Sequence, residues 1–161
     1  MVDPIIIKKS PNADSRTAKE GFSIEELEAS TNNHISDVEK ALLRFELMLS
    51  AAGQLHDFTK RAYLEEFYAD MLSLKPGDEF KDGKWYQMHI HRERHHLLSN
   101  APEDINLIDV LEYIADCVMA GLARSSAVSE LVIPDEMLQK AFANTVELLK
   151  RQVTVQGEVE A

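Results

Sequence analysis

Apolar side chains recur at intervals of three and four residues over most of the chain after residue 22. This spacing gives an α-helix one apolar face, because the helix repeats every 3.6 residues. Stripes of this kind run over 33–52, 54–72 and 105–125, with shorter ones over 85–98 and from Pro134 onward. No stretch alternates apolar and polar residues for long enough to build a sheet. The pattern predicts an all-α fold.

Capping and turn-forming residues mark the ends of these helices. Ser23 followed by Glu26 has the spacing of a capping box, in which each side chain satisfies a free N–H at a helix start. Gly53 is expected to end or bend the helix before it. "LKPGDEFKDGK" is typical of a loop, and Pro102 in "SNAPED" marks a further boundary.

The two ends of the chain lack a helical period. Residues 1–22 combine a short β-branched run with turn formers, which predicts an extended arm, either frayed or lying across the body. The polar tail over 154–161 is expected to be loose. A chain of 161 residues is too short for two ordinary domains, so one helical domain over 23–153 is predicted.

The composition of the chain restricts the cellular compartment and the classes of partner that it is expected to have. With 28 acidic and 17 basic residues, the formal charge is −11, which argues against a broad face for duplex nucleic acid. The single Cys117 excludes an internal disulfide and fits a reducing compartment. No apolar run reaches the roughly 20 residues of a membrane span, and "MVDPIIIKKS" does not resemble a signal peptide. A cytoplasmic protein that does not bind membranes is expected.

Histidine and aspartate are unusually placed in this helical sequence. Four of the six histidines lie in "HIHRERHH", His56 and Asp57 are adjacent, and Asp116 lies within the most apolar helix. Each feature alone has an ordinary interpretation, such as a surface histidine or an aspartate on the wet edge of a helix. Together they suit a metal site assembled from several helices, because imidazole and carboxylate bind Zn, Mn, Fe, Co and Ni. Asp109 and Glu112 share the face of Asp116 and belong either to this site or to a solvated stripe.

The order of these residues resembles the HD-domain superfamily of metal-dependent phosphohydrolases. "LHDFTKRAYLEEF", "RERHH" and "VLEYIADCVMAG" are similar to segments of small bacterial and bacteriophage proteins of that superfamily. The resemblance covers roughly residues 33–125 and implies a single HD-like helical bundle. It also implies a divalent ion, such as Mn, Fe, Co, Ni, Zn or Mg. The implied ligands are His34, His56, Asp57 and Asp116.

The resemblance further assigns a phosphate side to the site. His95 and His96 match positions that bind a second metal or the substrate phosphate, and Lys60 matches a phosphate-binding lysine. The implied catalytic residues are Asp57, Lys60, His95 and His96. The chain departs from branches with a glutamate soon after "HD", since its nearest acids are Glu65 and Glu66.

A continuous helix over the histidine cluster would not turn all four histidines inward. His89, Arg92 and His96 would share one face, whereas His91 and His95 would share another. His95 or His96 is therefore expected in the site, with His89 as a contributor and His91 on the surface. Arg92 or Arg94 could pair with a nucleotide phosphate in a bidentate geometry.

Three functional hypotheses follow from these features. The first is a metal-dependent hydrolase of a phosphate ester, with a nucleotide as the expected substrate. The second is a non-catalytic acidic helical module that keeps the HD scaffold and acts through a protein partner. The third is a structural bundle without metal, which makes the ordered His and Asp residues a coincidence. A homo-oligomer is compatible with all three.

Overall fold

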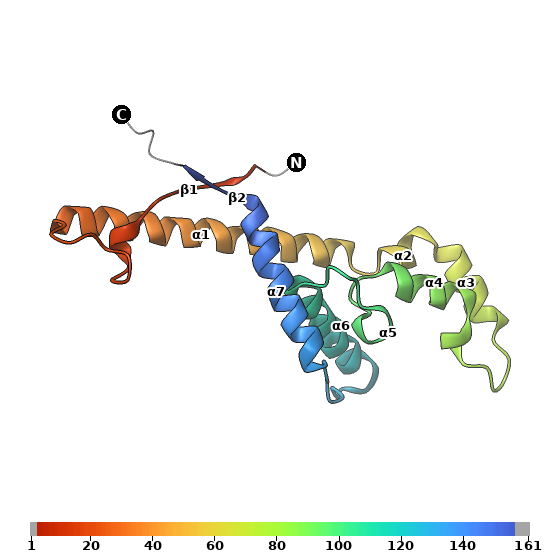
Figure 1. Cartoon of the computed structure of the whole chain (residues 1–161). Helices are drawn as coiled ribbons and strands as arrows, with labels where there is room; N and C mark the ends of the chain where they lie inside the picture. Colours follow the sequence, from red (N-terminus) through yellow and green to blue (C-terminus); the bar gives the residue numbers. More distant parts are fainter. Residues whose placement is uncertain (1–2, 157–161) are drawn as a thin grey trace. The chain divides into compact units, whose positions relative to one another are not determined.

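The computed structural model describes residues 3–156, and these residues are mostly helical, as predicted (Figure 1). The chain also contains two short strands, which the all-α prediction did not include. No helix within 3–156 has the length and apolar character needed to cross a membrane. The helices are α1 (Ile24–Leu55), α2 (Phe58–Ala62), α3 (Leu64–Ser73), α4 (Lys84–Arg92), α5 (Leu97–Asn100), α6 (Leu107–Ser125) and α7 (Asp135–Gln152).

The chain divides into two compact units. The first joins residues up to Leu47 with residues from Val146 onward, and the second is Met48–Thr145. Helices α1 and α7 each contribute to both units. The division into an arm over 1–22, one domain over 23–153 and a tail over 154–161 stays a prediction.

The first unit contains the small sheet. Strand β1 (Ile5–Lys8) pairs in parallel with β2 (Val153–Gln156), with Ile5 opposite Val153. Ile5 is buried, so the N-terminal arm is packed here rather than frayed. β-Branched side chains in both segments favour the extended backbone, but four-residue strands are too short to show an alternating pattern. Of the predicted loose tail, 154–156 lies in β2, and 157–161 lies outside the described residues.

Helix α1 begins with the predicted capping box. Ser23 N donates to Glu26 Oε2 at 2.8 Å, and Glu26 N donates to Ser23 Oγ at 3.2 Å. The helix then continues for 32 residues, through the predicted start near Asn33 and past Gly53. Gly53 was expected to end or bend the helix, and it does not end it. One glycine destabilises a helix by only about 1 kcal/mol, which is too little to stop it.

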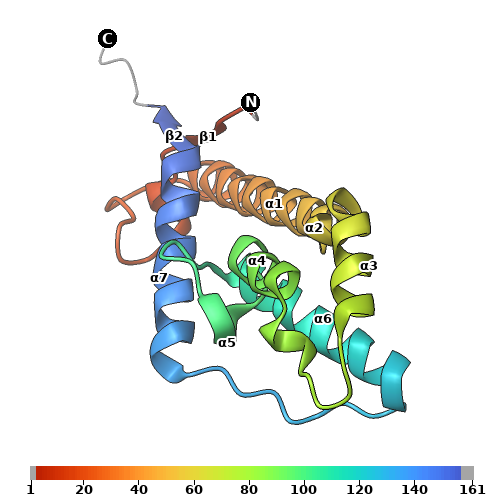
Figure 2. The ribbon, with the colours of Figure 1, turned by 90° about the vertical axis from the view of Figure 1, so that its right-hand side faces the viewer.

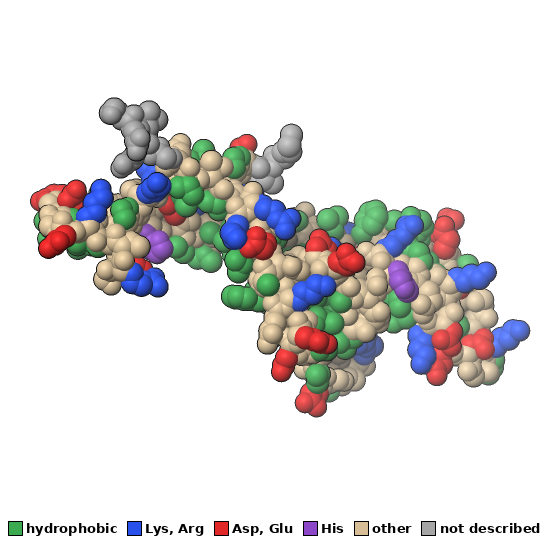
Figure 3. Space-filling model, in the orientation of Figure 1, with side chains coloured by type: hydrophobic (Ala, Val, Ile, Leu, Met, Phe, Trp, Pro, Cys, Tyr) green, Lys and Arg blue, Asp and Glu red, His purple; other side chains and the backbone are tan. Residues whose placement is uncertain are grey.

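The second unit holds the remaining helices, and Figure 2 shows α4 beside α3 and α5. The predicted helix over 54–72 is interrupted twice, at His56–Asp57 and at Tyr63. The predicted helix over 85–98 ends at Arg92, and α5 follows a non-helical turn. One cluster of buried apolar side chains in this unit consists of Leu97, Ile105, Val110, Tyr113 and Ala141. Between α3 and α4, acidic and basic side chains intermingle over the predicted loop, which includes the 3-10 turn η2 (Phe80–Asp82) (Figure 3).

Candidate metal centre

The turn after α1 positions the first two residues of the site. α1 ends at Leu55, and Asp57 has a left-handed backbone, with φ of 54°, before α2 begins. Aspartate tolerates this conformation better than most residues. The turn places His56 Nε2 3.5 Å from Asp57 Oδ2. Two adjacent residues can therefore face one site, which a regular helix would separate by about 100°.

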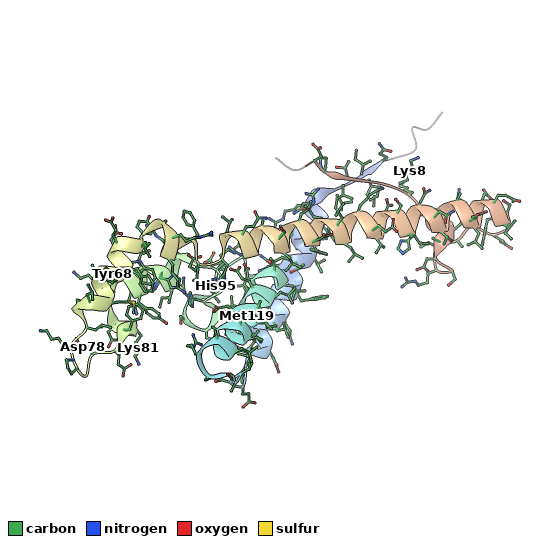
Figure 4. All side chains as sticks on the ribbon, turned by 180° about the vertical axis from the view of Figure 1, so that it is seen from behind. Lys8, Tyr68, Asp78, Lys81, His95 and Met119 are labelled. Carbon is green, nitrogen blue, oxygen red and sulfur yellow. The ribbon has the colours of Figure 1, made fainter. Side chains whose placement is uncertain are left out.

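The turn between α4 and α5 brings in the histidine cluster. His89 lies in the last turn of α4, and His95 and His96 follow in non-helical backbone. His89 and His95 are each only 1% exposed. Figure 4 shows His95 next to α6, in agreement with its contact to Glu112. The predicted helix does not continue through residues 93–96, so the positions of His95 and His96 are set by this turn and not by helical periodicity.

Four residues from these two turns form the first group that could hold a metal ion: Asp57, His89, His95 and His96. Asp57 Oδ1 lies 3.4 Å from His89 Nε2 and 3.7 Å from His95 Nε2. His96 Nε2 lies 2.8 Å from His89 Nε2. Donor atoms that share one ion at about 2.1 Å are roughly 3–4 Å apart, so both separations from Asp57 fit a common ion, and the two histidine nitrogens lie slightly closer than this range.

A second group adjoins the first and shares His95 with it. It consists of His56, His95 and Asp116. Asp116 belongs to α6, and its Oδ1 lies 3.5 Å from His56 Nε2. The imidazole rings of His56 and His95 lie against each other with centroids 4.3 Å apart and planes inclined by 39°. The two groups thus form one continuous cluster of nitrogen and oxygen donors.

A buried hydrogen-bond chain orients His89. Thr59 Oγ1 and Thr59 N both donate to Glu93 Oε1 at 2.6 Å. Because the single hydroxyl proton of Thr59 is used there, His89 Nδ1–H must donate to Thr59 Oγ1, which is 2.6 Å away. His89 Nε2 therefore directs a lone pair toward Asp57. Outer partners of this kind fix the tautomer of metal-binding histidines.

Glu112 has a similar relation to two other histidines. Its Oε1 accepts a hydrogen bond from His56 Nδ1 at 3.0 Å and lies 3.1 Å from His95 Nδ1. The second contact is close but does not have good hydrogen-bond geometry, so it is mainly electrostatic. Both rings consequently turn Nε2 toward the aspartates. Glu112 is half-buried within the site and is not part of a solvated stripe.

The protonation of the histidines reflects their surroundings. Burial, together with the charges of His95 and His89, lowers the pKa of His96 to about 4. Burial also lowers the pKa of His89. Burial acts in the same direction on His95, but contact with Glu112 outweighs it and raises the pKa of His95 above its ordinary value. His89 and His96 are therefore neutral near pH 7, which is the form that binds metal.

The carboxylates give the site an excess of negative charge. Burial raises the pKa of Asp57, but the hydrogen bond and charge of Lys60 outweigh it, so the pKa is lowered overall. The pKa of Glu112 is lowered by His95 and His56, again against the effect of burial. Lys60 is paired with Asp57 Oδ2, whereas the other oxygen of this carboxylate, Oδ1, is buried without a hydrogen-bond partner. An unpaired buried carboxylate oxygen facing imidazole nitrogens suits a divalent cation.

The structure brings together three of the four predicted metal ligands, namely His56, Asp57 and Asp116. His34 lies exposed on α1 in the first unit and belongs to neither group, so its role stays a prediction. His95 and His96, predicted on the phosphate side, lie among the candidate metal donors. Lys60 lies next to Asp57 at the partly exposed edge of the cluster.

The other predicted contributors are distributed differently. His91 is exposed, as expected, and contacts the backbone oxygen of Gln87. Arg94 is held by Asp109 at 2.7 Å and Asp104 at 2.9 Å, so it supports the fold near α6 rather than offering a free guanidinium. Arg92 is exposed and donates to the Tyr63 hydroxyl at 2.7 Å. Glu65 and Glu66 are exposed in the first turn of α3.

The sequence offered weak signals for the supporting residues. Glu112 lies four residues before Asp116 on the same helix. From this spacing alone, Glu112 could belong either to the site or to a solvent-exposed face of the helix. Thr59 and Glu93 carried no signal, because their hydrogen bond joins residues 34 apart in the sequence. Such contacts depend on tertiary packing rather than on local pattern.

A mainly apolar cavity opens beside the cluster. It has a volume of about 320 Å³ and reaches His56, Glu112 and Asp116 at one side. The rest of its lining comes from the end of α1 and from α6, namely Leu49, Ala52, Gly53, Leu111, Ala115 and Met119. Met119 is labelled on α6 in Figure 4. Apolar cavities with a few convergent polar groups commonly receive small ligands.

No protein-family model, curated protein or solved structure matches the chain.

Proposed function

We propose that the cluster binds a divalent metal ion and that the protein is a metal-dependent phosphohydrolase, as its resemblance to HD-domain proteins implies. The observation that carries the proposal is the buried Asp57 Oδ1, which has no hydrogen-bond partner and faces Nε2 of His89 and His95. The opposite nitrogens of these rings lie against Thr59 and Glu112. This arrangement supports a preorganised cation site.

The residues that would hold the ion are Asp57, His89, His95 and His96, with His56 and Asp116 available at the adjoining group. A bound divalent ion would lower the pKa of water and neutralise charge on phosphoryl oxygens. Mn, Fe, Co, Ni, Zn and Mg remain the candidates, of which the imidazole-rich donor set favours the transition metals.

Lys60 would provide the phosphate-binding cation. Its ammonium group is held beside the cluster by Asp57 and is 40% exposed, so it remains accessible to a ligand. A phosphate oxygen could share this ammonium, since lysine offers three donors. Lys60 would thereby stabilise negative charge that develops during hydrolysis.

The apolar cavity would bind the organic part of the ester. Its polar edge lies at His56 and Asp116, and its apolar walls come from alanine, leucine and methionine side chains. A volume of about 320 Å³ lies at the lower end of the range for small-molecule sites. A planar, weakly polar group such as a nucleobase fits these walls, which supports a nucleotide as substrate.

The test measures metal content and phosphate release on the same preparations. Purified protein is loaded with each candidate metal in turn, analysed for bound metal, and assayed with nucleoside mono- and triphosphates. We expect saturable metal binding and metal-dependent release of phosphate. Lys60→Ala should keep its metal while losing at least about tenfold in kcat/KM, and His91→Ala should match the wild type in both. Absence of metal binding would contradict the metal site, and full activity in Lys60→Ala would contradict its role.

The alternative is a binding module that keeps the metal as a structural element. It predicts metal binding without turnover of any phosphate ester. The departure from branches with a glutamate soon after "HD" favours this alternative, since Glu65 and Glu66 lie exposed on α3. The same assay separates the two functions, because both require metal and only one requires hydrolysis.

A further inference from the structure

One face of α1 carries large apolar side chains that the first unit leaves exposed. At 100° per residue these side chains lie within an arc of about 80° around the helix. We name them the α1 stripe. Its members, with their exposed fractions, are Ile24 (75%), Leu27 (40%), Ile35 (51%), Val38 (43%) and Leu42 (61%).

The hydrogen bonds that join α1 to the two terminal segments of this unit are made by the opposite side of the helix. Lys40 Nζ donates to the backbone oxygen of Ile6 at 3.1 Å. Arg44 donates to the backbone oxygen of Asp3 at 2.5 Å and to Gln152 Oε1 at 3.0 Å. Lys40 and Arg44 point roughly 140–180° away from the centre of the stripe. The sheet and the end of α7 therefore bind the polar side, and the stripe lacks a partner among the described residues of the first unit.

The spacing of the stripe is that of a helix–helix seam. Ile35, Val38 and Leu42 are separated by three and four residues, and Phe45 continues the series. Toward the start of the helix, Glu28 and Thr31 interrupt the series. This is the a/d pattern of a heptad repeat, in which each apolar side chain enters a gap on a second helix of the same type. A helix that packed on its own core would bury this face instead.

We propose that the α1 stripe packs against the α1 stripe of a second copy of this chain. A heptad seam is self-complementary, so an identical helix satisfies it without a further partner. The net charge of −11 makes an anionic membrane or a nucleic acid an unfavourable occupant.

The charges beside the seam are compatible with a parallel pair of copies. Glu39 and Glu46 occupy one flank of the stripe, and His34 and Ala41 occupy the other. In parallel register, Glu39 lies opposite His34 of the second copy, so the flanking positions from residue 34 onward bring no two glutamates together. The one like-charge contact in this register is at Glu28, seven residues before Ile35. An antiparallel pair would place glutamate against glutamate.

The exposed area is sufficient for a specific contact. The five aliphatic side chains of two copies expose on the order of 1,000 Å² in total, estimated from their exposed fractions, which is an upper bound on the apolar area that they can bury. The flanking atoms would raise the buried area to about the 1,200 Å² at which specific interfaces begin. Monomeric proteins rarely expose contiguous apolar patches of more than a few hundred Å².

Molar mass in solution tests the proposal. Full-length protein is analysed by light scattering and sedimentation over a range of concentrations, alongside Leu42→Glu and Leu47→Glu. Leu47 is 53% exposed on the same helix but lies about 140° away from Leu42, so it is a matched control. We expect the wild type and Leu47→Glu to be dimers, and Leu42→Glu to have half their molar mass with an unchanged helical circular-dichroism signal. Val38→Lys, at a second stripe position, should repeat the effect of Leu42→Glu.

Two results would overturn the proposal. One is a wild-type protein that stays monomeric at all concentrations. The other is a dimer that survives both Leu42→Glu and Val38→Lys, or that Leu47→Glu dissociates, because the contact would then involve another surface. Neither result depends on whether the protein binds metal or hydrolyses a phosphate ester.

Discussion

Asp57 meets three structural requirements that few residue types can meet together. It adopts a left-handed backbone at the turn, offers Oδ2 to Lys60, and turns a buried Oδ1 toward two imidazoles. Asparagine also tolerates the left-handed region, so Asp57→Asn changes the charge while keeping the backbone. The role of the carboxylate can thus be separated from that of the turn.

We expect Asp57→Asn to lose nearly all bound metal while keeping its helical circular-dichroism signal. The reason is that a carboxylate anion is replaced by a neutral amide, which is a much weaker ligand for a divalent cation. Metal content measured after exhaustive dialysis, and the thermal unfolding of both apoproteins, check the prediction. A variant that retains metal in wild-type amounts would remove Asp57 from the ligand set.

Glu112 links metal affinity to pH through His95. Its charge raises the pKa of His95, and a protonated imidazole cannot bind metal. Metal affinity should therefore fall as the pH drops through the raised pKa of His95 and should reach its plateau above it. In the apoprotein the sign is opposite, because the His95–Glu112 pair contributes stability below the unfolded pKa and loses it as the pH rises through the folded one.

Glu112→Gln should separate the two effects of this carboxylate. The variant loses the charge that orients His56 and His95, so metal affinity on the alkaline plateau should fall about 10- to 100-fold. The pH midpoint of binding should shift downward at the same time, because His95 no longer faces an anion. Competition with a coloured chelator between pH 5 and pH 9, values roughly bracketing the ordinary histidine pKa, measures both quantities. An unchanged midpoint would mean that His95 is not the group that titrates.

The helices show which features a sequence can predict and which it cannot. The capping box at Ser23 and Glu26 is a contact between neighbours in the sequence, and the structure confirms it. The breaks at Asp57 and after Arg92 have no proline or glycine to mark them, so the periodic pattern ran through them. The parallel pairing of Ile5 with Val153 joins the two ends of the chain, which no local pattern can reveal.

The candidate site was only partly predictable for the same reason. His56, Asp57 and Asp116 were identified by their order in the sequence, and the structure places them together. The participation of His89 depends on the turn at residues 93–96, because a continuous helix would have distributed the histidines over two faces. Glu112 and Thr59 are recognisable only once the rings that they contact are in place.

Helix α1 passes through Gly53 in an open position, so alanine there should stabilise the protein. A Cβ added at Gly53 meets no atom within 4 Å, and alanine is favoured over glycine in a helix by about 0.5–1 kcal/mol. Gly83→Ala is the control variant and should destabilise the protein. The added Cβ would collide with the Asp70 carboxylate and crowd the backbone oxygen of Phe80. Urea unfolding of both variants should show a higher midpoint for the first and a lower one for the second. A destabilised Gly53→Ala would mean that the helix needs a bend at this position.

The division into two units predicts that metal stabilises them unequally. Both groups of candidate ligands lie in the second unit, between His56 and Asp116, whereas β1, β2 and the first half of α1 lie in the first. A ligand stabilises the structure that binds it, by about 2.7 kcal/mol at a free concentration of 100 times Kd. Amide exchange should therefore slow by up to about 100-fold in the second unit when metal is added.

Hydrogen exchange followed by mass spectrometry can resolve this difference by peptide. We expect metal-dependent protection in peptides that contain His56–Thr59, His89–His96 and Glu112–Asp116, and little change in those from β1 and β2. Asp57→Asn provides the control, since added metal should then protect neither unit. Equal protection of both units would show that they unfold as one cooperative structure, and the stability of the sheet would then depend on the metal centre as much as that of α6 does.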